Sequence, residues 1–461
     1  MRLVKSTTLK RINILALLIT GFFFNINAQD NSPYSRYGLG DISPLTNILN
    51  RGMGGVSAAY SDLLSVNFNN PASYSAFRVN KVSGTGETLS GRIVLDAGVN
   101  FDSRTLREVN RVDKFTSPNT YFSYLQLGIP IKKGWGISFG LRPMTKISYR
   151  LQQNDRIAID SIVTQYRGDG GTFLATTGTG FAIKNFSAGF NFGYLFGKKD
   201  YSTERTLISD SIAYARGNFE TITSFGHIYL SGGLQQKFVF SKDKETKLDK
   251  SILRLGIYGN LKQDIKASQD LTRETFTRDQ NSGYMKLDSV YSQKDIKGTI
   301  VYPSTLGMGF IYEKAASIKD RGWMLGVDYI TTKWSDYRFF GATDLVKDSR
   351  EIRLGAQLMP PIVGDITYWK NVSYRAGIFA GTDYIDASGK LPVLGVSAGI
   401  GLPVLNLKDP ARRYKTQYTV VNLSFEYIKR GNNNNLLKEN LFRFSLGFSL
   451  SDNWFEKRKY N

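Results

Sequence analysis

Cysteine is absent from this 461-residue chain, and histidine occurs once, as His227. Without cysteine the chain can form no disulfide scaffold, no thiolate-ligated zinc or iron–sulfur site and no thiol nucleophile. A single histidine excludes a multi-histidine metal centre, and a histidine-dependent catalytic triad would need that one residue. We therefore expect no cofactor, no metal and no enzymatic activity. A hydrolase built on His227 is the least favoured alternative.

Long hydrophobic runs are also missing, because after residue 28 no apolar stretch reaches the roughly 18 residues of a transmembrane helix. Residues 1–28 combine a basic start, an apolar stretch from Ile12 to Phe24 and a small residue, Ala28, at a cleavage position. This pattern predicts a secretory signal peptide. Gln29 follows where a lipid-anchored protein would have cysteine, so we expect no lipid anchor.

Period-two alternation of apolar and polar residues dominates the remaining chain. Successive side chains of a strand point to opposite faces, so each alternating segment predicts a strand with one apolar and one polar face. Fourteen segments show the pattern, and many exceed the ~5–6 residues of a typical soluble strand. They begin near Arg92, Tyr121, Trp135, Phe173, Phe186, Thr221, Leu253, Thr299, Trp323, Ile352, Val372, Leu394, Thr419 and Phe442.

The length of these segments favours a transmembrane barrel over a soluble β-sandwich, because a tilted transmembrane strand needs ~9–11 residues. Tight links such as Lys132–Gly134 and Lys184–Asn185 alternate with long polar stretches such as Gln152–Gly170 and Lys266–Lys297. We interpret the short links as turns on one side of a membrane and the long stretches as loops on the other. The predicted fold is all-β, a single antiparallel barrel of about 14 strands.

If the apolar faces meet lipid, the opposite faces line the lumen. The inward charged residues would be Asp96, Arg142, Lys146, Arg254, Asp328, Glu351, Arg353, Arg375, Glu426 and Arg443. Ion pairs that brace the barrel are the first interpretation; the second is that one or two arginines bind a substrate carboxylate while apolar side chains hold its tail. The candidates for such a pocket are Phe122, Tyr124, Arg142, Met144, Arg353, Arg375 and Phe379.

Residues 29–77 do not alternate, and small residues are dense in them. Two motifs stand out: Arg51-Gly52-Met53-Gly54-Gly55, and Asn70-Pro71-Ala72. Small residues let backbone pass close to backbone, as in a chain threaded through a narrow lumen; a flexible linker is the alternative. A phosphate-binding loop is disfavoured because neither a preceding strand nor a following Lys-Ser/Thr is present.

These two motifs resemble the FadL-type outer-membrane transporters of fatty acids and other hydrophobic compounds. A weaker likeness continues through Glu351–Gly355 and Tyr374–Gly377, and the Pro33–Gly38 opening looks like the Bacteroidota branch. The resemblance implies a fourteen-stranded barrel plugged by an N-terminal hatch. It divides the chain into a signal peptide (1–28), a hatch segment (29–77), a barrel (78–455) and a basic tail (456–461).

The resemblance implies passive uptake of a hydrophobic small molecule, which leaves sideways through a gap between strands. Pro143 cannot donate to a sheet ladder, so it is the candidate for that gap, with a strand-end bend as the alternative. The same branch contains relatives that act as subunits of a type 9 secretion or outer-membrane assembly complex. Apolar lumen walls would favour uptake, whereas a filled lumen and a broad extracellular platform would favour the complex subunit.

The formal net charge of +21 is the last feature of the sequence that bears on partners. Such a charge attracts anionic surfaces. We expect no nucleic acid, because the chain is predicted to be exported and carries no recognition module. Outer-membrane lipid, lipopolysaccharide, a hydrophobic ligand and outer-membrane protein partners are the candidates, in the cell outer membrane.

Overall fold

The computed structural model describes residues 31–77, 79–81, 88–109, 111–157, 160–209, 212–243, 249–279, 283–362, 367–387, 389–404 and 417–454. The predicted signal peptide (1–28) and basic tail (456–461) lie outside the described residues.

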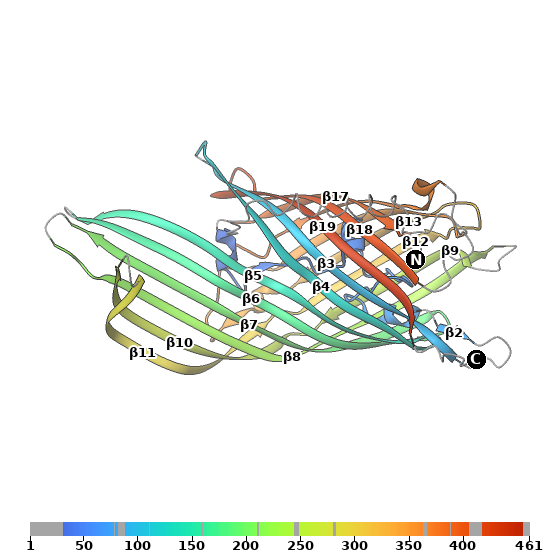
Figure 1. The fold of residues 1–461 in the computed structure, drawn as a ribbon, viewed down its shortest axis with the longest axis horizontal. Helices are drawn as coiled ribbons and strands as arrows, with labels where there is room; N and C mark the ends of the chain where they lie inside the picture. Colours follow the sequence, from blue (N-terminus) through green and yellow to red (C-terminus); the bar gives the residue numbers. More distant parts are fainter. Residues whose placement is uncertain are drawn as a thin grey trace, which may run out of the picture.

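A closed antiparallel barrel of fourteen strands forms the body of the molecule (Figure 1). The ring closes where β19 pairs with β3. In chain order the barrel strands are β3 (Thr88–Glu108), β4 (Lys114–Lys132), β5 (Trp135–Ile157), β6 (Asp160–Ile183), β7 (Phe186–Ile208), β8 (Arg216–Lys242), β9 (Asp249–Asn260), β12 (Thr305–Lys314), β13 (Gly322–Thr332), β15 (Ser349–Met359), β16 (Ser373–Thr382), β17 (Pro392–Pro403), β18 (Gln417–Arg430) and β19 (Leu437–Trp454). The predicted fold class is confirmed.

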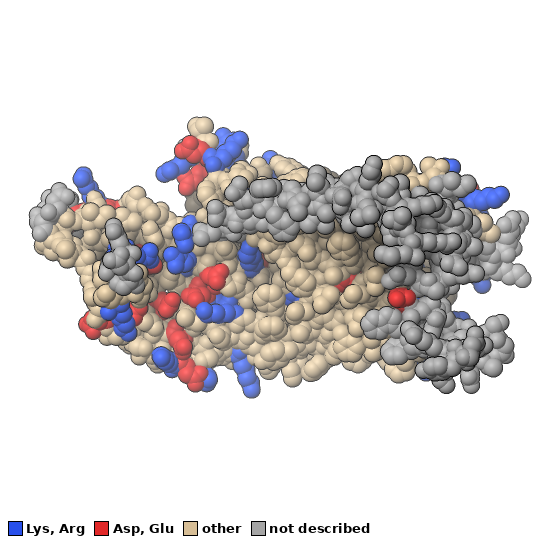
Figure 2. Space-filling model, viewed as in Figure 1, with Lys and Arg blue, Asp and Glu red and all other residues tan. Residues whose placement is uncertain are grey.

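Strand β7 shows how the alternating sequence produces a membrane-facing band. Its even-numbered residues from Phe186 to Phe196 are exposed aromatics and small residues, whereas Asn191 and Leu195 are buried in the lumen. Beyond Phe196 the outward positions become Lys198 and Asp200. The aromatic stretch therefore covers about the 25 Å apolar height of an outer-membrane barrel. Figure 2 shows the same change, from an uncharged middle to a charged end.

The charged end is an extension of the sheet, built from β5, β6, β7, β8 and two further strands, β10 (Gln263–Asp279) and β11 (Gly283–Tyr302) (Figure 1). The prediction that Gln152–Gly170 and Lys266–Lys297 are loops is wrong, because both stretches are paired strands. Charged residues such as Lys198 and Asp200 occupy outward positions in this extension, so apolar alternation is weak there. Cross-strand contacts such as Lys286 on β11 with Glu274 on β10 (3.2 Å) support the pairing instead.

The end of the barrel with the short links, at Lys132–Trp135 and Ile183–Phe186, is the turn end, and the opposite end is the loop end. The remaining elements lie inside the barrel or at its ends. They are η1 (Pro33–Arg36), β1 (Asp41–Ile42), α2 (Ile48–Arg51), η2 (Pro71–Ala76), β2 (Val79–Lys81), η3 (Trp334–Asp336), β14 (Arg338–Phe339) and η4 (Tyr368–Asn371). Among the described residues, no helix has the length and apolar character needed to cross a membrane.

Candidate functional site

The hatch, residues 31–77, fills the lumen, and the backbone of its Gly52–Gly54 segment touches glycines of three neighbouring barrel strands. A Cβ on Gly355 of β15 would lie 2.2 Å from the Met53 carbonyl oxygen, and one on Gly377 of β16 would lie 2.0 Å from the Gly54 nitrogen. A Cβ on Gly399 of β17 would lie 2.7 Å from the Gly52 Cα. These contacts are backbone against backbone, so a side chain on either partner would force the hatch and the wall apart.

Arg51 joins the helix α2 to four consecutive strands of the wall. Its side chain is 2% exposed and donates to Asn100 Oδ1 (2.8 Å), Ser123 Oγ (2.8 Å) and Ser445 Oγ (3.2 Å). Glu426 Oε2 lies 3.9 Å from the same guanidinium. One hatch arginine thus joins strands β3, β4, β18 and β19, and removing it would leave several buried polar groups without a partner.

Asp328 and Arg353 of the barrel wall form hydrogen bonds with the turn that follows α2. Asp328 is fully buried, and its Oδ2 accepts from the backbone nitrogens of Ser57 (2.7 Å) and Ala58 (2.8 Å). Arg353 donates to the Gly55 carbonyl at 3.0 Å. Gly54 and Gly55 have φ angles of +71° and +80°, which non-glycine residues rarely adopt. The glycine motif therefore shapes the turn as well as its fit to the wall.

Asn70 fixes the second half of the hatch near the turn end. Its Nδ2 donates to the carbonyls of Ala58 (2.6 Å), Leu234 (3.2 Å) and Ile257 (3.3 Å). Its Oδ1 accepts from the Ala72 nitrogen (3.1 Å) and so caps η2, which has Pro71 in its first turn. The side chain bridges the hatch to β8 and β9.

The start of the hatch is held by a buried ion cluster at the loop end. Arg104 contacts Asp41 (3.0 Å) and Glu439 (2.6 Å), and Arg430 contacts Asp41 (2.9 Å) and Asp383 (2.7 Å). Burial acts to raise the pKa of Asp41, but the two arginines outweigh it and hold that pKa below its ordinary value. Asp41 is therefore ionised at neutral pH and binds both wall strands.

A seam interrupts the barrel wall between β4 and β5. The two strands pair from Lys132–Trp135 to Leu125–Leu141, and no pair of residues beyond that point is in register between them. The bulge between Pro143 and Thr145 lies immediately beyond the last pair, on the β6 side of β5. The hatch strand β1 pairs with β5 there, through Asp41 with Lys146. The hatch thus occupies the edge that β4 leaves.

Arg142, Met144 and Arg353 share a small internal cavity of about 70 Å³ behind the seam. Arg142 donates to the Leu45 carbonyl (3.0 Å) and stands over the Phe68 ring, 4.5 Å from its centroid. Among the described residues no carboxylate lies within 4.0 Å of its guanidinium. A buried arginine without an anion is costly, so this cavity could hold an anionic group.

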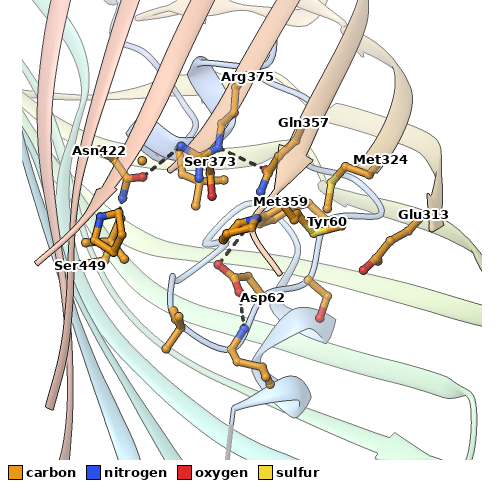
Figure 3. A pocket seen from close by; sticks show the side chains of 18 of the residues that line it. Tyr60, Asp62, Glu313, Met324, Gln357, Met359, Ser373, Arg375, Asn422 and Ser449 are labelled. Atoms are coloured by element: carbon orange, nitrogen blue, oxygen red, sulfur yellow. Dashed lines mark hydrogen bonds between the residues drawn. The ribbon is translucent and has the colours of Figure 1, made fainter. Parts of the chain in front are cut away.

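Two larger cavities lie on the other side of the hatch. One of about 220 Å³ includes Arg353 and Phe379. The other, about 400 Å³, opens at the turn end and includes Arg375, whose guanidinium is held by Gln357 Oε1 (3.2 Å) and Asn422 Oδ1 (3.1 Å) (Figure 3). The predicted pocket residues are therefore divided among three separate spaces.

Phe122 is the one pocket candidate that the structure places outside, where it is 39% exposed. The prediction that it faces the lumen with Tyr124 is wrong, because a bulge at Ser123 shifts the register between Gly98 and Val99 and reverses the alternation. Tyr124 is 1% exposed; its hydroxyl donates to Asp96 (3.1 Å) and accepts from the Ile48 nitrogen (3.1 Å). It is a hatch contact.

An aromatic lid at the loop end was not anticipated from the sequence. Trp334 stacks on Tyr384 with ring centroids 4.3 Å apart, and a Cβ on Gly38 would meet both rings. The Tyr384 hydroxyl donates to the Gly40 carbonyl at 2.7 Å. The only sequence signal was the aromatic content of two connections that show no strand pattern. The lid covers the start of the hatch.

The one histidine, His227, belongs to the wall strand β8. His227 lies in register with Leu195, which is 1% exposed in the lumen wall. Within the described ranges no group of three His, Asp or Glu residues is arranged to hold a metal ion. The site consists of a hatch, its anchors, three cavities and a seam.

The sequence matches the family described as BamG over residues 8–461. A comparison with curated proteins found no match. Among solved structures, the chain is similar to a Pseudomonas aeruginosa FadL homologue, with a TM-score of 0.51, 12% identity and coverage of 91% of this chain and 100% of that one. It is also similar to the Pseudomonas putida toluene transporter TodX, with a TM-score of 0.51, 14% identity and coverage of 89% and 99%. At these identities the likeness is one of fold.

Proposed function

This chain belongs to the BamG family, and we propose that its barrel is a subunit of a protein complex in the outer membrane, with the hatch as a fixed plug. A type 9 secretion complex or an outer-membrane assembly complex is the kind of partner assembly that fits. A signal peptide at residues 1–28 would direct the chain to export and would then be cleaved. No catalytic step is part of the proposal.

The filled lumen carries this proposal. Arg51, Asp328, Asn70 and Asp41 bond the hatch to strands on all sides of the barrel. Ligand pockets usually enclose ~300–1,000 Å³ with mostly apolar walls. The cavity behind the seam measures about 70 Å³, and the one that includes Phe379, on the other side of the hatch, about 220 Å³. The 400 Å³ space opens at the turn end beside Arg375, Gln357 and Asn422. Such a lumen favours a closed barrel, and the sheet extension supplies a platform outside the membrane.

Native extraction followed by mass spectrometry tests the proposal. The barrel should leave its own membrane with protein partners in fixed stoichiometry and without a bound apolar small molecule. The purified barrel should also carry no ion current in a planar bilayer. Recovery of the barrel alone, with fatty acid or another apolar molecule bound, would contradict it.

Hydrophobic-compound uptake is a second candidate, and the seam is the observation that favours it. An interrupted wall beside Pro143 offers a sideways route, and the Arg142 cavity offers a cation for the head group of an acid such as a long-chain fatty acid. In this reading the hatch strand β1 must leave β5 to open the route. Met144 and Phe379 would contact the apolar tail, whereas Phe122 would touch lipid only.

A cross-link across the β1–β5 pair separates the two candidates. Ile42 and Thr145 are partners in register, and the chain has no other cysteine, so Ile42→Cys with Thr145→Cys can form one disulfide. If uptake uses the seam, oxidation should stop entry of a fluorescent fatty acid into cells, and reduction should restore it. The single variant Ile42→Cys is the control. Equal uptake in the oxidised and reduced states would exclude the sideways route.

A further inference from the structure

The inner face of the sheet extension continues the lumen wall past the end of the hatch. Antiparallel partners that lie directly opposite share one face of a sheet. One row across six strands therefore consists of Leu151, Tyr166, Thr203, Phe219, Arg273 and Tyr291. The next row outward includes Gln153, Thr164, Arg205, Gly217 and Thr275. On β7 the hatch contact ends one row below, where the Tyr201 hydroxyl donates to the Arg36 carbonyl (2.6 Å), and on β5 it ends at the backbone of Arg150, which bonds to Asn31 (3.1 Å).

This face presents aromatic rings and arginines to solvent. Phe219 and Tyr291 are each 43% exposed. The Arg273 guanidinium stands between them, 5.9 Å from the Phe219 centroid and 5.7 Å from the Tyr291 centroid. Arg205 is exposed in the neighbouring row. We call Tyr166, Phe219, Arg273, Tyr291 and Arg205 the ladder face.

Charge is arranged differently on the two faces of the extension. The outer face carries six acidic residues on four strands, and three of them form ion pairs with Lys198, Arg278 and Lys286; the six are Asp169, Asp200, Glu204, Glu220, Asp270 and Glu274. Among the described residues of the ladder face, the acidic ones lie away from its centre: Asp155 and Asp288 are on the edge strands β5 and β11, and Asp160 is at the start of β6. The centre of the ladder face is therefore cationic and aromatic, whereas acidic and basic side chains alternate on the back of the same sheet.

We propose that the ladder face is the docking surface for an extended acidic segment of a partner protein, one that carries apolar side chains between its carboxylates. This deepens the proposed function, on which it rests, by naming the surface and the chemistry of the partner. Six strands at ~4.8 Å spacing give a width of about 24 Å, which ~7 extended residues would cross.

The chemistry of the ladder face favours a polypeptide. Aromatic rings lie on both sides of the Arg273 guanidinium. Its N–H groups can therefore donate to a carboxylate in a bidentate pair. Exposed Phe219 and Tyr291 gain from contact with apolar side chains. A peptide supplies carboxylates and apolar groups alternately, as a strand laid along the face requires. A phosphate of lipopolysaccharide is the competing source of negative charge.

A defined peptide tests this surface on the full-length barrel in detergent. The probe is a fluorescein-labelled peptide of four Asp-Phe repeats, and the comparison peptide has four Lys-Phe repeats. The Asp-Phe peptide should raise the fluorescence anisotropy and the Lys-Phe peptide should not. Arg205→Gln with Arg273→Gln should weaken binding by at least about 100-fold, because each lost charged hydrogen bond alone weakens it about tenfold or more.

The matched control removes the same charge from the opposite face. Arg150 and Arg167 are partners in register on the outer face, so Arg150→Gln with Arg167→Gln should leave binding unchanged. Equal loss in both double variants would overturn the proposal, as would competition by lipopolysaccharide from a rough strain. Heat-modified migration on gels shows that each variant is a closed barrel.

Failure of the docking surface and failure of the proposed function give different results. If native partners still copurify with the Arg205→Gln, Arg273→Gln variant, the complex is held elsewhere; the docking surface is then wrong and the proposed function stands. If the wild-type barrel has no stoichiometric partner, the proposed function falls, whatever the peptide does. If the Arg205→Gln, Arg273→Gln variant loses both peptide binding and its native partners, and the outer-face control variant loses neither, the docking surface and the proposed function are both supported.

Discussion

Replacing Arg51 with methionine should loosen the hatch more than any comparable change on the surface. Methionine keeps much of the side-chain volume but removes the donors to Asn100, Ser123 and Ser445 and the charge near Glu426. Breaking a buried charged network by removing one partner costs about 3–5 kcal/mol. The population of the displaced hatch should therefore rise at least about 100-fold.

Single-cysteine labelling measures that population, because the chain has no cysteine of its own. Ser57 is fully buried in the hatch and its backbone nitrogen donates to Asp328, so Ser57→Cys reacts with a maleimide only when the hatch is displaced. When opening is fast relative to labelling, the labelling rate is proportional to the displaced population. Arg51→Met should raise that rate at least about 100-fold.

Two further variants make the result specific. Arg111 is an exposed arginine paired with Glu108 on the surface, so Arg111→Met should change the labelling rate by less than about threefold. Adding Glu426→Gln to Arg51→Met should recover part of the loss, since the buried carboxylate is then neutral. If Arg51→Met labels at the rate of Arg111→Met, the anchor role of Arg51 is refuted.

Three further changes test other contacts. Gly377→Ala places a methyl group 2.0 Å from the Gly54 nitrogen, so it should lower the barrel's melting temperature by several degrees, whereas Gly232→Ala, with 3.7 Å to its nearest neighbour, should not; equal shifts would refute the backbone contact. Asn70→Ala removes three bonds to carbonyls and should raise Ser57→Cys labelling by about tenfold or more; an unchanged rate would place the constraint elsewhere. The pKa of Asp41 is depressed in the folded state, so its stabilisation is complete above the unfolded pKa of ~3.9 and is lost as pH falls through the lower folded value. Channel current in planar bilayers should therefore appear below about pH 4 in the wild type, while Asp41→Asn should lose this pH step.

The barrel could be predicted from sequence because lipid enforces the alternation, as in β7 from Phe186 to Phe196. The extension could not, because water on both sides of a paired strand imposes no apolar face. The wrong prediction for Phe122 has a local cause. One bulged residue, Ser123, exchanges the inward and outward positions of the strand residues on its two sides. The glycine motif indicated close backbone contact, yet its partners Gly355, Gly377 and Gly399 are ordinary strand glycines until the registers are known.

The glycine contacts between hatch and wall also set an order of events in biogenesis. Gly54 and its partners leave no room for a side chain to pass, and the anchors of the hatch lie all around the ring. The ring closes through β19, the last strand to be synthesised, which pairs with β3, the first barrel strand. We therefore expect the barrel strands to close around a hatch that has already folded. The hatch then acts as a template for the circumference, and its residues should acquire protection from hydrogen exchange before the β3–β19 pair does.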